Sequence, residues 1–137
     1  MHQFPISGPM LIDVEQLGEI CVLHCRGRLV AGQDQEYIQS KMKEIKKLDC
    51  SKVIADFREV HSIGSTGLTF LLNLYTSVAR KPGGGFVLVG ARPLVQHVLE
   101  LTRLDTVIPL AADLASGFAA LHEAARSESE GISGQTF

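Results

Sequence analysis

The fold is decided by one stretch, Val53-Ile-Ala-Asp-Phe-Arg-Glu-Val-His-Ser-Ile-Gly-Ser-Thr-Gly-Leu-Thr-Phe-Leu-Leu-Asn-Leu-Tyr75. Its apolar start, Val53 to Phe57, predicts a strand buried on both faces, and the polar residues after it predict a short turn. A helix leaves this turn, and Ser65 and Thr66 stand where it begins. A hydroxyl at this place can accept a hydrogen bond from a free N–H of the first turn, which predicts a helix cap. One of the two hydroxyls is also a candidate phosphorylation switch.

The composition indicates one globular domain. The chain has 137 residues, of which 45% are hydrophobic and 20% charged, and its formal net charge is -2. This charge disfavours a nucleic-acid partner, because no excess of basic residues is present to neutralise phosphates. The sequence has no run of about 18 apolar residues, so we expect no membrane span, and residues 1–8 lack the basic and apolar segments of a signal peptide. We therefore expect a cytoplasmic protein.

The cysteine and histidine pattern predicts neither disulfides nor a metal site. Cys21, Cys25 and Cys50 are odd in number and lack the spacing of a disulfide framework, which indicates a reducing compartment. Cys21 and Cys25 fall on one face of a predicted strand, where we expect them to pack as small buried hydrophobic residues. The five histidines are scattered, so we expect no metal and no cofactor.

Strands and helices alternate along the rest of the chain. Hydrophobic periodicity predicts strands at 11–16, 20–25, 52–57, 86–90 and 107–110, a loop at 27–32, and helices at 34–47, after Gly67, from Pro93 and from Asp113. The first two strands form an antiparallel hairpin. The order predicts an α/β fold with a mixed, mostly parallel sheet of about five strands packed with about four helices. We expect residues 1–10 to be a flexible N-terminus, 11–125 the domain and 126–137 a disordered tail.

The helix after Gly67 leaves one question open. Its main apolar stripe consists of Leu68, Leu71, Leu72, Tyr75 and Ala79, and Phe70 and Leu74 lie off that stripe. These two side chains either form an exposed patch that binds a partner or are covered by a neighbouring helix. The lysines between positions 41 and 47 favour a solvated helix face over the alternative, a binding patch. The glycine-rich turn at 82–85 lies between a helix and a strand, which is the wrong order for a phosphate-binding loop.

The chain resembles STAS domains of the anti-sigma factor antagonist type. The resemblance covers residues 11–125 and is carried by Asp56-Phe57, Ile63-Gly-Ser-Thr-Gly-Leu68 and Leu101-Thr-Arg-Leu-Asp105. It departs from the family pattern at Gly64, where an aspartate is usual, at Val30, where an acidic residue is common, and at Arg103, where glycine is usual. The family implies a STAS-like fold and a bacterial regulator of transcription that works by partner switching.

The resemblance also implies the functional residues. The serine that a cognate anti-sigma kinase phosphorylates maps to Ser65, with Thr66 as the second choice. The protein then binds an anti-sigma factor or serine kinase as a monomer or weak dimer, and phosphorylation releases it. The expected partner-binding residues surround this position: His61, Ser62, Gly64, Ser65, Thr66, Gly67, Leu68, Phe70 and Leu74.

Two other functions remain open at this point. The chain could be the cytoplasmic STAS component of a lipid or anion transporter assembly. It could also be an enzyme or small-ligand binder, if Asp56, Glu59, His61 and Asp105 gather at the carboxyl ends of the strands. Asp56 could instead be a satisfied structural carboxylate inside its strand, and His61 has no evident nucleophile except Ser65. We therefore expect a binding protein without catalytic residues.

Overall fold

A computed structural model describes residues 11–29, 35–79 and 81–122. The element order is β1 (Leu11–Leu17), β2 (Ile20–Leu29), α1 (Gln35–Leu48), β3 (Lys52–Ile63), α2 (Ser65–Ala79), β4 (Gly85–Val89), α3 (Pro93–Leu101), a 3-10 turn η1 (Leu104–Thr106) and β5 (Leu110–Ala111). A last helix begins at residue 114 and continues to the end of the described residues. The expected flexible N-terminus, Val30, the Asp34 helix start and the C-terminal tail lie outside these residues.

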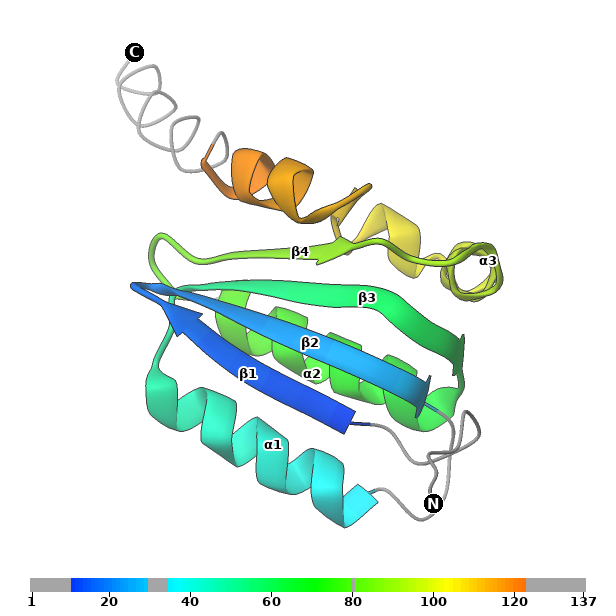
Figure 1. The fold of residues 1–137 in the computed structure, drawn as a ribbon, viewed down its shortest axis with the longest axis horizontal. Helices are drawn as coiled ribbons and strands as arrows, with labels where there is room; N and C mark the ends of the chain where they lie inside the picture. The colour runs from blue at the N-terminus through cyan, green and yellow to red at the C-terminus, as the bar shows by residue number, and fades with distance from the viewer. Residues whose placement is uncertain (1–10, 30–34, 80, 123–137) are drawn as a thin grey trace, which may run out of the picture.

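The five strands form one mixed sheet in the order β1-β2-β3-β4-β5 (Figure 1). β1 and β2 pair antiparallel, while β2, β3, β4 and β5 pair in parallel. The predicted fold class and the antiparallel hairpin at one edge are therefore confirmed. Each crossover from one parallel strand to the next passes through helical chain, as parallel pairing requires.

The two central strands are longer than predicted, so the expected turn after Phe57 and the loop from Gly27 are wrong. β3 continues through its polar residues to Ile63, and β2 continues to Leu29. The two strands stay paired over this part, with Arg26 opposite Glu59 and Gly27 opposite Val60, although the register shifts between His24 and Arg26 and again between Gly27 and Arg28. A bulge of this kind changes which side chains face the core, so the polar run does not need to leave the sheet.

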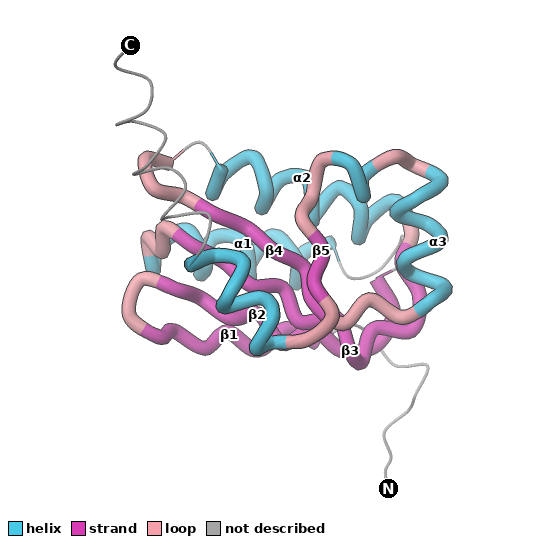
Figure 2. Tube along the Cα trace, turned by 90° about the horizontal axis from the view of Figure 1, so that it is seen from above, coloured by secondary structure: helices cyan, strands magenta, loops and turns pink. Residues whose placement is uncertain are grey.

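Helices cover the two faces of the sheet unequally (Figures 1 and 2). α1 and α2 lie along one face, and α3 lies beside the far end of β3. The main core lies between these helices and the sheet, and Phe57, Phe70, Leu71, Leu88 and Leu99 are among its fully buried side chains. On the other face a smaller core joins Val22, Ile54, Val87 and Val89 to Leu121 of the last helix.

The last helix begins as predicted, and the short strand before it does not. The Asp113 carboxylate accepts a hydrogen bond from the backbone N–H of Ser116 at 2.8 Å, which is the geometry of an N-cap. Asp113 therefore caps this helix. The predicted strand 107–110 is only Leu110–Ala111, because η1 and the turn after it occupy the preceding residues.

The buried face of α2 also differs from the predicted stripe. The buried residues of α2 are Gly67, Phe70, Leu71, Leu74 and Val78, while Leu72 is exposed. α2 packs on the sheet and also beside α1, so its apolar face is rotated toward the second neighbour. In α3, Val95 and Leu99 are buried, while Leu94 is 56% exposed.

The prediction of free cysteines is wrong for Cys21 and Cys50, which form a disulfide. Cys21 lies in β2 opposite Val53 of β3, and Cys50 lies between α1 and β3, so the parallel pairing brings the two Cα atoms to 6.0 Å. That distance lies in the range that a disulfide can bridge. Cys25 is free and buried, as expected of a small hydrophobic residue, and burial raises the pKa of its thiol.

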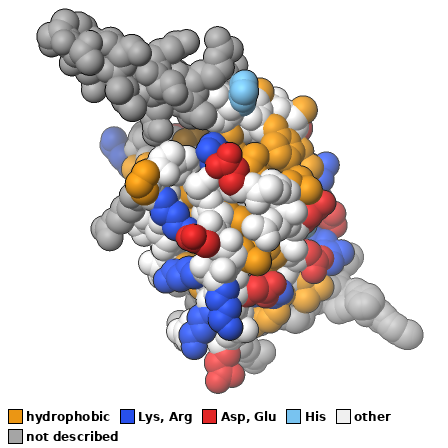
Figure 3. All heavy atoms as spheres, turned by 90° about the vertical axis from the view of Figure 1, so that its left-hand side faces the viewer, with side chains coloured by type: hydrophobic (Ala, Val, Ile, Leu, Met, Phe, Trp, Pro, Cys, Tyr) orange, Lys and Arg blue, Asp and Glu red, His pale blue; other side chains and the backbone are white. Residues whose placement is uncertain are grey.

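The end of the molecule where α1 ends and β4 begins carries mixed charge. Figure 3 shows Lys and Arg side chains beside Asp and Glu side chains over this end. Two ion pairs join them, Lys52 with Glu19 at 3.4 Å and Lys81 with Asp49 at 2.9 Å. The lysines of α1 are exposed or half-buried. No helix in the described part of the chain is long and apolar enough to cross a membrane.

Candidate functional site

The candidate site is built around the first turn of α2, directly after the end of β3. Ser65 is the first residue of the helix and Thr66 the second. The carbonyl of Gly64 accepts the hydrogen bond of the Leu68 N–H at 2.9 Å, so Gly64 takes the N-cap position. The prediction that a Ser65 or Thr66 hydroxyl caps the helix is therefore wrong. Glycine is tolerated at an N-cap, and the two hydroxyls lie inside the first turn instead.

The two hydroxyls differ in their access to solvent. Ser65 is exposed and Thr66 is half-buried. Within residues 11–29, 35–79 and 81–122, neither hydroxyl makes a hydrogen bond to another protein group. Ser65 is thus the more accessible of the two oxygens at the helix start.

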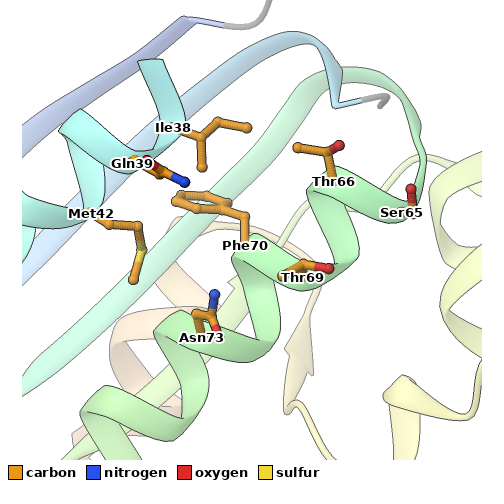
Figure 4. A pocket seen from close by; sticks show the side chains of 8 residues that line it. All are labelled: Ile38, Gln39, Met42, Ser65, Thr66, Thr69, Phe70 and Asn73. Carbon is orange, nitrogen blue, oxygen red and sulfur yellow. The ribbon is translucent and has the colours of Figure 1, made fainter. Parts of the chain in front are cut away.

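A shallow groove of about 200 Å³ runs from these hydroxyls between α1 and α2. Figure 4 shows Ile38, Gln39 and Met42 on the α1 side, and Ser65, Thr66, Thr69 and Asn73 along α2. The Phe70 ring reaches from α2 toward α1 and forms the floor, with only 1% of the residue exposed. The groove therefore has an apolar floor and an uncharged polar bank on α2.

The predicted partner-binding residues divide into accessible and buried groups. His61 and Ser65 are exposed, and Ser62, Gly64, Thr66 and Leu68 are half-buried. Gly67, Phe70 and Leu74 are buried, so the expected exposed patch of Phe70 and Leu74 is wrong. The neighbouring-helix alternative holds, because both side chains pack into the core that α1 and α2 share.

Sequence reasoning missed the α1 bank of the groove and the polar row of α2. That row consists of Thr69, Asn73 and Thr76, which are spaced for one helical face and carry no charge. The uncharged polar face of this helix was the signal that could have indicated the groove, because exposed helix faces usually carry charged side chains.

Asp56 has a structural role in the sheet. Its side chain is 6% exposed and pairs with Arg58 through two oxygens, at 3.0 Å to Nε and 2.8 Å to Nη2. Its Oδ2 also lies 3.1 Å from Nδ1 of His24, whose Nε2 lies 3.1 Å from the Glu15 carboxylate. These four side chains form a ladder across β1, β2 and β3, on the sheet face that the last helix covers only in part (Figure 2).

The ladder shifts the pKa of two of its members. Burial favours the neutral form of Asp56, but hydrogen bonds from Arg58 and His24 outweigh it and hold the pKa of Asp56 below its ordinary value. Burial likewise disfavours protonated His24, but the Glu15 and Asp56 carboxylates outweigh it and raise the pKa of His24 above its ordinary value. Asp56 is therefore a satisfied carboxylate.

The remaining acidic and histidine candidates do not assemble with Asp56. Glu59 and His61 are exposed at the end of β3, and Asp105 lies in η1 after α3. No group of three His, Cys, Asp or Glu side chains in the described ranges is placed to hold a metal ion. Among those ranges, the proposed acid–base cluster at the carboxyl ends of the strands is not formed.

Comparison with known proteins places this geometry in a family. The family model described as STAS domain matches residues 12–117. A comparison with curated protein sequences finds no significant match. Among solved structures, an anti-sigma factor antagonist from Mycobacterium paratuberculosis is 21% identical with a TM-score of 0.74, and the match covers 88% of this chain and 99% of that one.

Two further structures are similar. An anti-sigma-factor antagonist (STAS) domain protein from Planctomyces limnophilus is 19% identical with a TM-score of 0.65, covering 80% of this chain and 96% of that one. The Bacillus cell fate determinant SpoIIAA in its phosphorylated form is 19% identical with a TM-score of 0.57, covering 74% and 92%. At these identities the likeness concerns the fold. The family match spans most of the chain, from β1 into the last helix, and on that ground the chain belongs to the STAS domain family.

Proposed function

We propose that this chain is an anti-sigma factor antagonist. It binds an anti-sigma factor or switch kinase through the surface at the start of α2, and phosphorylation of Ser65 releases it. The observation that carries the proposal is the Ser65 hydroxyl, which is exposed at the first position of α2 and is not engaged by another group in the described chain. The names of the similar structures support it, since they include antagonists of this kind and one phosphorylated form.

The chemistry of the switch follows from the position of Ser65. A phosphate adds a charge of about -1.5 to -2 at neutral pH. The N–H groups of Ser65, Thr66 and Gly67 precede the first intrahelical hydrogen bond, which Leu68 donates, so they can face an anion. The phosphate is then tolerated within the domain. The unfavourable step is the desolvation of that charge under a bound partner, so phosphorylation weakens the complex without unfolding the protein.

Gly64, which stands where the family usually has an aspartate, affects how a kinase can recognise Ser65. Gly64 supplies the carbonyl at the N-cap, and that role needs no side chain. Glycine at this position places no carboxylate next to Ser65 in the sequence, and this favours the modified state. The kinase must recognise Ser65 through other groups, of which exposed His61 is one candidate.

The test measures binding to purified anti-sigma kinases of the host. Ser65→Asp should bind at least about tenfold more weakly than the unmodified chain, because a charge then has to be desolvated at the interface. Ser40→Asp is the matched control, since Ser40 is an exposed serine of α1 outside the groove. Mass spectrometry of the protein from its host should place phosphate on Ser65 and not on Thr66. Equal binding of the two aspartate variants would contradict the proposal.

A further inference from the structure

The groove beside Ser65 continues along the whole of the α1–α2 junction. Its first part ends at Gln39, Met42 and Asn73, and the same three residues line a second hollow of about 320 Å³. The second hollow adds Lys43 and Lys46 of α1, and Thr76 and Ser77 of α2. From Ser65 to Ser77 the α2 bank extends about 18 Å, at about 1.5 Å for each helical residue. An open trough of this length suits a polypeptide segment better than a compact small molecule.

Charge along the groove is one-sided. Among the lining residues that the structure describes, Lys43 and Lys46 are the ionisable ones, and both are exposed. The nearby pair on α1 is Lys41 with Glu44 at 3.2 Å, and in the described part of the chain no carboxylate pairs with Lys43 or Lys46. α2 carries no acidic or basic residue from Ser65 to Ala79. The groove is therefore apolar and neutral at its Ser65 end and positive at its other end.

The geometry points to an acidic, amphipathic segment of the partner protein as the occupant of this groove. Its apolar side chains lie over Ile38, Met42 and the Phe70 floor, and its carboxylates face Lys43 and Lys46. The inference rests on the proposed function, because it names the partner surface that docks beside Ser65. A negatively charged membrane is the weaker match, because the charge borders a concave trough and consists of only two lysines.

This polarity links the groove to the phosphorylation switch. A phosphate on Ser65 would be the first charge on the α2 bank, at the neutral end of the trough. The apolar side chains of a segment lying in the trough would then meet this charge at the end where they dock. Release follows from the cost of desolvating the phosphate against apolar groups, and it needs no movement of α1 or α2.

The first experiment uses two synthetic peptides and the full-length protein. Both peptides span about four helical turns and place leucines at helical spacing, with glutamates between the leucines in one and lysines in the other. Amide shifts in NMR spectra should show the glutamate peptide at Gln39, Met42 and Asn73, and the lysine peptide should leave these amides unmoved. Equal shifts with both peptides, no shift with either, or binding only to phosphatidylglycerol vesicles would overturn the inference.

Charge-reversal variants give the matched comparison. Lys43→Glu and Lys46→Glu should each weaken binding of the glutamate peptide by about five- to tenfold, as expected for reversing one charge of an exposed pair. Lys47→Glu is the control, because it makes the same change on an exposed α1 lysine outside the groove. An equal loss in all three variants would mean that only net charge matters, and would overturn the assigned groove.

The same variants, measured against the purified host anti-sigma kinases, separate the two proposals. If a kinase binds and Ser65→Asp releases it while Lys43→Glu and Lys46→Glu have no effect, the groove inference is wrong and the proposed function stands. If no kinase binds but the glutamate peptide maps to the groove, the proposed function is wrong and the docking surface stands. Loss of kinase binding in the groove variants, with Lys47→Glu unaffected, supports both.

Discussion

Replacing Arg103 with glycine should stabilise the domain. Arg103 follows the end of α3 and has φ 63 and ψ 17, in the left-handed region, where a side chain crowds its own backbone. Its backbone N–H donates to Glu100 and its carbonyl accepts from the Thr106 N–H and hydroxyl. These bonds involve only main-chain atoms of residue 103, so glycine keeps them. Glycine is also the residue most common at this place after a helix.

The size of the effect follows from two opposing contributions. Relief of the left-handed conformation is worth about 1–2 kcal/mol, and the greater freedom of glycine in the unfolded chain costs about 0.5–1 kcal/mol. The net gain is about 0.8 kcal/mol, which corresponds to a rise in Tm of about 3 °C for a domain of this size. Arg103→Ala is the control, because it removes the guanidinium but keeps the left-handed backbone, and it should leave stability nearly unchanged.

Circular dichroism melts and urea titrations of the three proteins decide the matter. The order of stability should be Arg103→Gly above the other two, with the same urea m-value in all three, since the surface exposed on unfolding is unchanged. A glycine variant that is no more stable than the alanine variant would refute the reasoning. The strain would then not lie in the backbone of this residue.

Three further predictions concern the sheet. The pKa of His24 is raised above 6.5 in the folded protein, so protonated His24 stabilises the fold below pH 6.5, and this contribution is lost as the pH rises through the folded pKa. The drop in Tm from pH 5.5 to pH 8.5 should therefore be smaller in His24→Gln than in the unmodified protein, and equal drops would contradict this prediction. Reducing the Cys21–Cys50 disulfide, which closes a loop of 29 residues, should lower the free energy of unfolding by about 3.5 kcal/mol. As a control, the reductant should not shift the melting curve of a Cys21→Ala, Cys50→Ala double variant. Tyr37→Phe removes the hydroxyl that lies 2.9 Å from the backbone nitrogen and 3.3 Å from the carbonyl oxygen of Ile12, at the outer edge of β1. The Ile12 amide should then exchange faster with deuterium, and the free energy of unfolding should fall by about 1–2 kcal/mol. Unchanged exchange would show that the hydroxyl does not protect this edge of the sheet.

The order of elements was predictable because each depends on local periodicity. The β1–β2 hairpin, the helix begun by Pro93 and the Asp113 cap all follow from residues close together in sequence. The full length of β3 was not predictable, because its polar half is held in the sheet by pairing with β2, which is distant in sequence. The same holds for the Cys21–Cys50 disulfide, since only the parallel register brings the two residues together.

The sequence predicted that Ser65 lies at the start of a helix, but it did not predict the shape of the surface around it. The position of Ser65 at the start of α2 follows from the motif itself. The burial of Phe70 and Leu74 and the existence of the groove depend on where α1 packs, which periodicity within α2 alone does not determine. A helix with two packing neighbours hides a wider arc than the stripe that one neighbour would need.

The strand order also has a consequence for synthesis on the ribosome. Because every strand pairs with its predecessor in sequence, the sheet can grow strand by strand in the order in which the chain emerges. α1 and α2 can cover one face of the sheet early, whereas Val22, Ile54 and Val87 on the other face are buried only when Leu121 of the last helix packs on them. A nascent chain stalled before the last helix should therefore expose one hydrophobic face of the sheet, and we expect a ribosome-associated chaperone to bind that face.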